Sequence, residues 1–125
     1  MILIGDNLVP SENLSFIDSI ADIEYTIANS TVVFNYDENL LLYCSKNDVE
    51  FAVVVENLTQ AIYCNALNCK YIICEKKLAK TVQKIAENYI FDSKVLAIIE
   101  DSNEIEKVAL NEIDGVIYSN LLENK

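Results

Sequence analysis

Residues 51–75 read FAVVVENLTQAIYCNALNCKYIICE, and this stretch decides the fold class. It begins with a continuous apolar run, Phe51–Val55, and ends with another, Tyr71–Cys74, each followed by a glutamate. Short apolar runs rich in β-branched residues are typical of strands buried on both faces of a sheet. Between them, Leu58 to Asn68 has the length and apolar spacing of a helix. The stretch therefore predicts a strand, a helix and a strand, the unit from which parallel sheets are built.

The same alternation continues along the chain on both sides. Apolar residues between Lys76 and Phe91 recur at i, i+4, i+7 and i+8, which is the spacing of one helical face. The other expected elements are a strand at 31–34, a helix over about 38–45, a strand at 95–99, a helix that starts near Ser102 or Asn103 and a strand at 116–118. Strands that alternate with helices in this way predict a parallel sheet with right-handed crossovers.

The first thirty residues carry weaker signals. Ile2–Ile4 is an apolar run of strand type, and 14–17 is expected to form a second short strand. Ser19 and Asp22 have the spacing of a capping box, which predicts a helix that reaches about Thr26. The alternative is a single helix over 12–27.

We predict a single α/β domain over residues 1–125, a length typical of one domain. Its expected form is a three-layer, mainly parallel sheet of five or six strands, flavodoxin-like in general shape. The alternation does not determine strand order, so a half-barrel of the same βα units is the alternative. Little chain follows the strand at 116–118, which we therefore expect at an edge of the sheet, where it could pair with a second copy in a homodimer.

The composition excludes several kinds of site. The nine basic residues are all lysines, there is no histidine, and with 20 acidic residues the formal charge is −11. Without histidine the chain can form neither a Ser-His-Asp triad nor a His-ligated metal site. Its two glycines, Gly5 and Gly115, are too far apart to form a phosphate-binding loop. The negative charge and the lack of arginine argue against nucleic acid and anionic membranes as partners.

Apolar runs are short throughout, so we expect no membrane span. Met1–Ile4 is followed by Gly5, Asp6 and Asn7, without the basic and long apolar regions of a secretion signal. We therefore expect a cytoplasmic protein with reduced thiols that pack in the core, Cys44 and Cys69 being the most exposed. The four cysteines, which lack C-x-x-C spacing, are Cys44, Cys64, Cys69 and Cys74.

Carboxylates recur at the ends of the predicted strands. The carboxyl ends of parallel strands share one edge of a sheet, where ligands commonly bind. Side chains that converge there could hold a hard cation such as Mg²⁺ or raise one another's pKa. The alternative is structural, because a carboxylate just before a helix is stabilised by the helix dipole. The candidate metal ligands are Glu56, Glu75, Glu100 and Asp101.

Basic charge gathers in one segment, because five of the nine lysines lie between Lys70 and Lys84. On the predicted helix over 76–91 they form either a solvated face or a docking surface for an acidic partner, such as another subunit of this acidic protein.

Two functions remain open, and the sequence does not decide whether the protein is an enzyme. The first is a non-enzymatic protein-interaction or regulatory module without a cofactor, which binds a protein partner or a second copy of itself. It agrees with the absence of histidine, of arginine and of a glycine-rich loop. The second is a small-molecule or divalent-metal-binding domain, with or without catalysis, that uses the strand-end carboxylates. Convergence of Glu56, Glu75 and Glu100 beside a pocket would favour the second.

Overall fold

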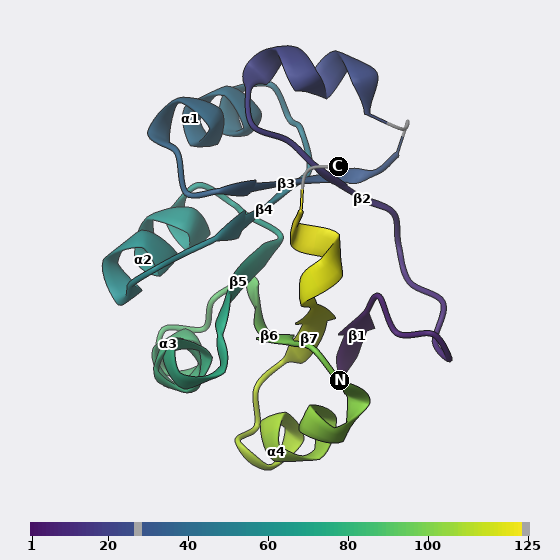
Figure 1. Ribbon diagram of the computed structural model, residues 1–125. Helices are drawn as coiled ribbons and strands as arrows, with labels where there is room; N and C mark the ends of the chain where they lie inside the picture. Colours follow the sequence, from purple (N-terminus) through teal and green to yellow (C-terminus); the bar gives the residue numbers. More distant parts are fainter. Residues whose placement is uncertain (27–28, 124–125) are drawn as a thin grey trace.

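The computed structural model describes residues 1–26 and 29–123, which form one curled sheet of seven strands (Figure 1). The strands are β1 (Ile2–Ile4), β2 (Leu14–Phe16), β3 (Thr31–Asn35), β4 (Phe51–Val54), β5 (Tyr71–Glu75), β6 (Lys94–Ile99) and β7 (Gly115–Tyr118). Their order across the sheet is β1-β7-β6-β5-β4-β3-β2, and every neighbouring pair is parallel. From β2 to β7, each strand therefore lies beside the next one in sequence.

The helices lie between these strands or at their ends. They are α1 (Glu38–Lys46), α2 (Leu58–Ala66), α3 (Lys76–Asn88) and α4 (Ile105–Leu110), with the 3-10 helices η1 (Ile20–Tyr25), η2 (Ser102–Glu104) and η3 (Ser119–Leu122). The Asp37 side chain accepts the N–H of Leu40 at the start of α1, and Asn57 accepts that of Gln60 at the start of α2. Each bond satisfies one of the donors that a helix leaves free at its start. No helix of the described ranges is long and apolar enough to cross a membrane.

Each α-helix of the described chain ends in the same way. A residue with left-handed backbone follows the cap: Asp48, Asn68, Ile90 and Glu112. The next N–H donates to a carbonyl one turn back in the helix: Val49 to Cys44, Cys69 to Cys64, Phe91 to Ala86 and Ile113 to Val108. This is the Schellman arrangement, in which the residue after the left-handed turn packs back onto the core.

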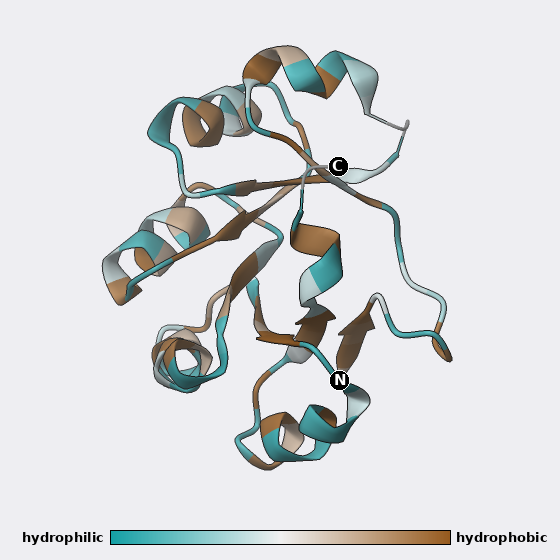
Figure 2. Cartoon of the chain, viewed as in Figure 1, coloured by the Kyte–Doolittle hydropathy of each residue, from teal (hydrophilic) through white to brown (hydrophobic). Residues whose placement is uncertain are grey.

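The two faces of the sheet are covered differently. The outer face packs against α1 to α4 and η1, through strand residues such as Val32 and Val53. The inner face, which includes Val33 and Ile73, packs against η3, drawn in yellow inside the curve of the sheet in Figure 1. Figure 2 shows the strands as apolar along their length. Burial on both faces explains why the strand sequences show no polar alternation.

The fold is the half-barrel given above as the alternative, and the three-layer, flavodoxin-like prediction is wrong. Right-handed crossovers that always step in one direction place every helix on one face, whereas helices on both faces require a reversal of strand order. The predicted count of five or six strands is also wrong, because β1 and β2 both pair into the sheet. Nor is β7 an edge strand, since it lies between β6 and β1, so its position does not support pairing with a second copy.

The predicted strand and helix near the N-terminus are confirmed. β2 pairs with β3, and η1 begins after Ser19, whose N–H donates to the Asp22 carboxylate at 3.2 Å. The alternative of one helix over 12–27 is wrong, because β2 interrupts it; its last residue, Ile27, lies outside the described residues.

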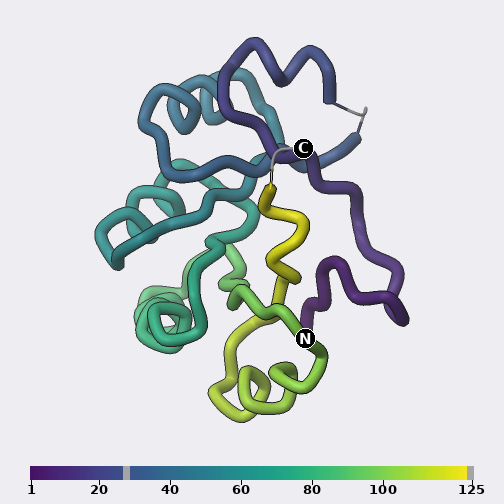
Figure 3. The backbone as a smooth tube through the Cα atoms, viewed as in Figure 1, coloured from purple at the N-terminus to yellow at the C-terminus, as the bar shows by residue number. Residues whose placement is uncertain are grey.

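Residues 5–13, which have no regular structure, carry the chain from β1 at one edge of the sheet to β2 at the other (Figure 3). The Glu12 carboxylate attaches this segment to the sheet. It accepts hydrogen bonds from Lys70 Nζ at 2.8 Å, from Thr31 Oγ1 at 2.9 Å and from the Tyr71 hydroxyl. Burial raises the pKa of Glu12, but these hydrogen bonds outweigh it and hold the pKa below its usual range. We name these four residues the Glu12 clamp.

Candidate functional site

Two of the predicted carboxylates lie at the starts of separate helices. Glu56 lies between β4 and α2, is exposed, and donates its N–H to Oε1 of Gln60 at 2.8 Å. Glu75 ends β5 and precedes α3, but its side chain makes no capping hydrogen bond. Both positions suit a carboxylate that is stabilised by a helix dipole, as the structural alternative expects.

The other two predicted carboxylates, Glu100 and Asp101, follow β6. Their N–H groups donate to Oε2 of Glu104 at 2.7 and 3.0 Å, and Asp101 Oδ1 accepts the N–H of Asn103 at 2.8 Å. The Lys76 ammonium binds the other oxygen of Glu104. This contact, with the two N–H groups, lowers the pKa of Glu104 to about 2. The side chain that organises this turn is therefore Glu104, which the sequence pattern did not single out.

No three His, Cys, Asp or Glu side chains in residues 1–26 and 29–123 are grouped so that they could hold a metal ion. A metal bound by Glu56, Glu75, Glu100 and Asp101 thus stays a prediction, with no matching cluster among the described side chains.

Glu100 and Asp101 do line a cavity at the carboxyl edge of the sheet. The cavity has a volume of about 540 Å³ and is also lined by Asp6 and Tyr118. The Tyr118 hydroxyl donates to Asp6 Oδ2 at 2.7 Å, and the N–H of Leu8 donates to Oδ1 at 2.8 Å. The Tyr118 hydrogen bond raises the pKa of Tyr118 to about 12 and lowers that of Asp6. Neither group has a pKa near neutrality, as proton transfer at neutral pH would require.

All four cysteines of the described chain are free and buried. Cys44 and Cys69, the two expected to be the most exposed, are only 1% and 3% exposed and lie in the core of the outer face, so neither thiol is at the surface. Burial raises the pKa of Cys44 to about 11 and that of Cys74 to about 12. Because the thiolate is the nucleophile, burial leaves these thiols unreactive at neutral pH.

The surface of α2 is uncharged, and its exposed residues are Thr59, Ile62, Tyr63 and Ala66. None of the nine residues of Leu58–Ala66 is charged, although 23% of the whole chain is. Ile62 and Tyr63 are exposed by 46% and 56%. Charged side chains usually cover the outer face of a surface helix. The outer face of α2 instead has the composition of the centre of a protein interface.

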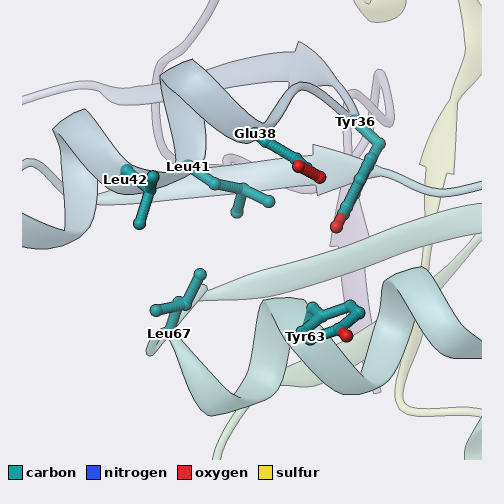
Figure 4. A pocket seen from close by; sticks show the side chains of 6 residues that line it. All are labelled: Tyr36, Glu38, Leu41, Leu42, Tyr63 and Leu67. Atoms are coloured by element: carbon teal, nitrogen blue, oxygen red, sulfur yellow. The ribbon is translucent and has the colours of Figure 1, made fainter.

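A groove of about 280 Å³ lies between α1 and α2 (Figure 4). In Figure 4, Leu42 of α1 and Leu67 after α2 approach from opposite walls, and the Glu38 carboxylate lies beside Tyr36. Burial, with a contribution from Glu38, raises the pKa of Tyr36. The lining residues are Tyr36, Glu38, Leu41, Leu42, Tyr63 and Leu67.

A second groove, of about 520 Å³, lies between α2 and α3 and is lined by uncharged residues: Leu58, Ile62, Asn65, Ala66, Ile85, Tyr89 and Phe91. Ile62 lines this groove and Tyr63 lines the first one, so the two grooves flank the exposed surface of α2. We name α2 and its two grooves the α2 face. Its exposed apolar side chains are Leu42, Ile62, Tyr63 and Tyr89.

The two borders of the α2 face carry opposite charge where α1 and α3 begin, whereas at the other end Lys46 in the last turn of α1 is basic like Lys84 of α3. Glu38, in the first turn of α1, lines the α1 border. On α3, Lys77 and Lys84 are exposed and lie seven residues apart on one side of the helix, next to the row that contains Ile85. Within the described ranges neither lysine forms an ion pair.

The α2 face was not predicted, although the sequence contains a signal for it. From Asn57 to Cys69 no residue is charged, whereas the apolar spacing of this helix predicts only its buried side. No protein-family model matches the chain, and no curated protein sequence matches it either.

Proposed function

We propose that the protein is a non-enzymatic protein-interaction module and that its partner docks on the α2 face. The observation that carries this proposal is an uncharged surface helix, α2, flanked by two largely apolar grooves. Single exposed apolar residues are ordinary on protein surfaces, but contiguous ones mark interaction sites. Here Leu42, Ile62, Tyr63 and Tyr89 extend across three neighbouring helices.

The chemistry of the larger groove, between α2 and α3, favours a protein over a small molecule. Small-molecule sites usually combine an apolar pocket with several convergent polar groups. The groove between α2 and α3 offers only Asn65 and the Tyr89 hydroxyl, and Tyr89 is largely exposed. Tyrosine is enriched in protein interfaces because its ring is apolar and its hydroxyl tolerates water.

The titratable groups at the carboxyl edge support a function without catalysis. A general acid or base works best when its pKa lies near the working pH. Hydrogen bonding raises the pKa of Tyr118 to about 12 and lowers that of Glu104 to about 2. Both groups therefore keep one protonation state across the neutral range.

An introduced thiol tests whether the α2 face is covered. Because the cysteines of the described chain are buried, an exposed cysteine would be the main site of maleimide reaction. In Ile62→Cys, we expect fast labelling of dilute purified protein and labelling slowed several-fold in an extract of the producing cells, because the docked partner covers the thiol.

The matched control is Leu110→Cys on α4, where the leucine is 78% exposed and lies outside the α2 face. We expect this variant to react equally fast in both conditions. Equal rates for Ile62→Cys in dilute protein, in the extract and in purified protein at about 1 mM would contradict the proposal.

A second candidate is the binding of a small cationic molecule in the cavity at the carboxyl edge. Asp6, Glu100 and Asp101 line this cavity together with apolar residues such as Leu3 and Ile105, a combination that suits an amine with a hydrocarbon part. Melting temperatures measured with Mg²⁺, Mn²⁺, Ca²⁺, nucleotides, polyamines and EDTA test it. A ligand at 100 times its Kd adds about 2.7 kcal/mol to the free energy of unfolding. No shift with any of these ligands would count against this candidate.

A further inference from the structure

The charge pattern of the α2 face is that of a surface that binds its own copy, and we infer that its partner is a second copy of this chain. The inference rests on the proposed function, because it names the partner of the same face. Where the helices begin, Glu38 gives the α1 border a negative charge and Lys77 gives the α3 border a positive charge, and α2 between them is neutral. A surface that is negative on one side and positive on the other is complementary to itself.

The geometry of the helical layer fits a two-fold axis. α1, α2 and α3 follow one another around the outer face and run in the same direction, because they connect parallel strands (Figure 1). A two-fold axis parallel to α2 would place α2 on the copy's α2, and α3 on the copy's α1. The rotation preserves helix direction, so Lys77 in the first turn of α3 meets the copy's Glu38 in the first turn of α1. Each dimer contains this contact twice. The same axis brings Lys84 towards the copy's Lys46 in the last turn of α1, so the attraction between the borders is confined to the ends where the helices begin.

The apolar part of the face is complementary under the same axis. Ile62 lies on the α3 side of α2 and Tyr63 on the α1 side. The rotation brings the α3 side of one copy against the α1 side of the other. Ile62 then packs on the copy's Tyr63, and Tyr63 on the copy's Ile62, which is the reciprocal contact that a symmetric interface requires.

The net charge explains why this side of the molecule is suited to self-association. Each copy carries a charge of −11, so two copies repel each other at most approaches. The run from Lys70 to Lys84 holds five of the nine lysines; four of them lie on α3, and Lys77 and Lys84 border the α2 face. An acidic copy is repelled least where these lysines lie.

A cycle of charge reversals tests the arrangement. Sedimentation equilibrium from about 1 μM to about 1 mM would give Kd for wild type, Glu38→Lys, Lys77→Glu and the double variant. Each single reversal turns two attractive contacts into two repulsive ones, so we expect it to raise Kd about ten-fold. The double variant restores opposite charges, and we expect its Kd to return close to the wild-type value.

The controls lie on α4, outside the α2 face. Glu106→Lys and Lys107→Glu change the net charge by the same amounts as the single reversals and should leave Kd within about two-fold of wild type. Ile62→Asp should abolish the dimer, whereas Leu110→Asp should not. These side chains are exposed, so the variants are expected to fold.

The outcomes separate this inference from the proposed function. If the wild-type protein stays monomeric up to about 1 mM, the inference that its partner is a second copy is overturned. If the thiol of Ile62→Cys is still protected in the extract, the α2 face binds a different protein and the proposed function stands. A dimer that survives Ile62→Asp, or that the double reversal does not restore, forms through another surface and also overturns the inference.

Discussion

Ile90, directly after α3, combines a left-handed backbone with a β-branched, exposed side chain. Its φ is 53°, a conformation in which the Cβ atom clashes with the following carbonyl, and its side chain is 84% exposed. Asp48 and Asn68 hold the same place after α1 and α2, and both residue types tolerate this backbone. Local structure therefore gives no reason for isoleucine at position 90. Position 90 lies next to Tyr89 at the border of the α2 face. A copy bound there would cover the Ile90 side chain, and this is a reason for an apolar residue at this position.

At position 90, glycine should improve the fold and impair association. Ile90→Gly relieves the steric strain and gives up little buried area, so we expect the free energy of unfolding in urea to rise by about 1 kcal/mol. The same variant should weaken dimerisation several-fold. Asn68→Gly is the matched control and should change stability by less than half as much, because asparagine already tolerates a positive φ. A destabilised Ile90→Gly would show that the side chain contributes more to the fold than its exposure implies.

At the scale of elements, the Glu12 clamp holds the crossing segment against the sheet, and its contribution to stability should depend on pH. The pKa of Glu12 is lowered in the folded state, so its ionised form stabilises the protein above the pKa of the unfolded chain, about 4.3. This contribution is lost as the pH falls through the folded pKa. Glu12→Gln should lower the free energy of unfolding by about 1 kcal/mol at pH 7 and by much less near pH 3.

Urea unfolding at both pH values checks this prediction, with Glu24→Gln on exposed η1 as the control that should change little at either. An equal loss for Glu12→Gln at both pH values would mean that the clamp acts through packing and not through charge.

Most elements could be predicted from the sequence, but their arrangement could not. Apolar runs such as Phe51–Val55 and the helical spacing of Lys76–Phe91 report which side chains are buried. The strand forms over Phe51–Val54 and the helix over Lys76–Asn88, so both elements are present with earlier ends than the pattern predicts. The pattern does not report on which face of the sheet a helix packs. That depends on strand order, and the order depends on pairings such as β1 with β7, which join opposite ends of the chain.

The candidate site illustrates the same limit. Strand-end carboxylates are visible in the sequence, but Glu56 and Glu75 each lie at a separate helix start. Periodicity shows that one side of α2 is buried, and it says nothing about how its apolar residues on the other side are covered. No residue from Asn57 to Cys69 is charged, and in the folded protein this uncharged segment forms the centre of the candidate interface.

At the scale of the whole molecule, the half-barrel determines which surface is available for docking. Its inner face packs against η3, whereas its outer face is covered by a layer of helices in which α2 lies between α1 and α3 (Figure 1). The whole chain carries a charge of −11, and four of its nine lysines lie on α3, within this layer. Association through the α2 face must therefore overcome a repulsion between whole molecules in order to form a few favourable contacts at the borders.

This balance predicts that added salt strengthens the dimer. At about 10 mM salt the screening length is about 30 Å, so two copies repel each other as whole molecules, whereas at about 150 mM it is about 8 Å and mainly the border charges interact. We expect Kd, measured by sedimentation equilibrium, to fall about ten-fold over this range. Ile62→Asp should stay monomeric throughout, which distinguishes association through the α2 face from unspecific clustering in salt. A Kd that rises steadily with salt would instead show that attraction between the border charges outweighs the repulsion between whole molecules, because salt screens attractive pairs as well.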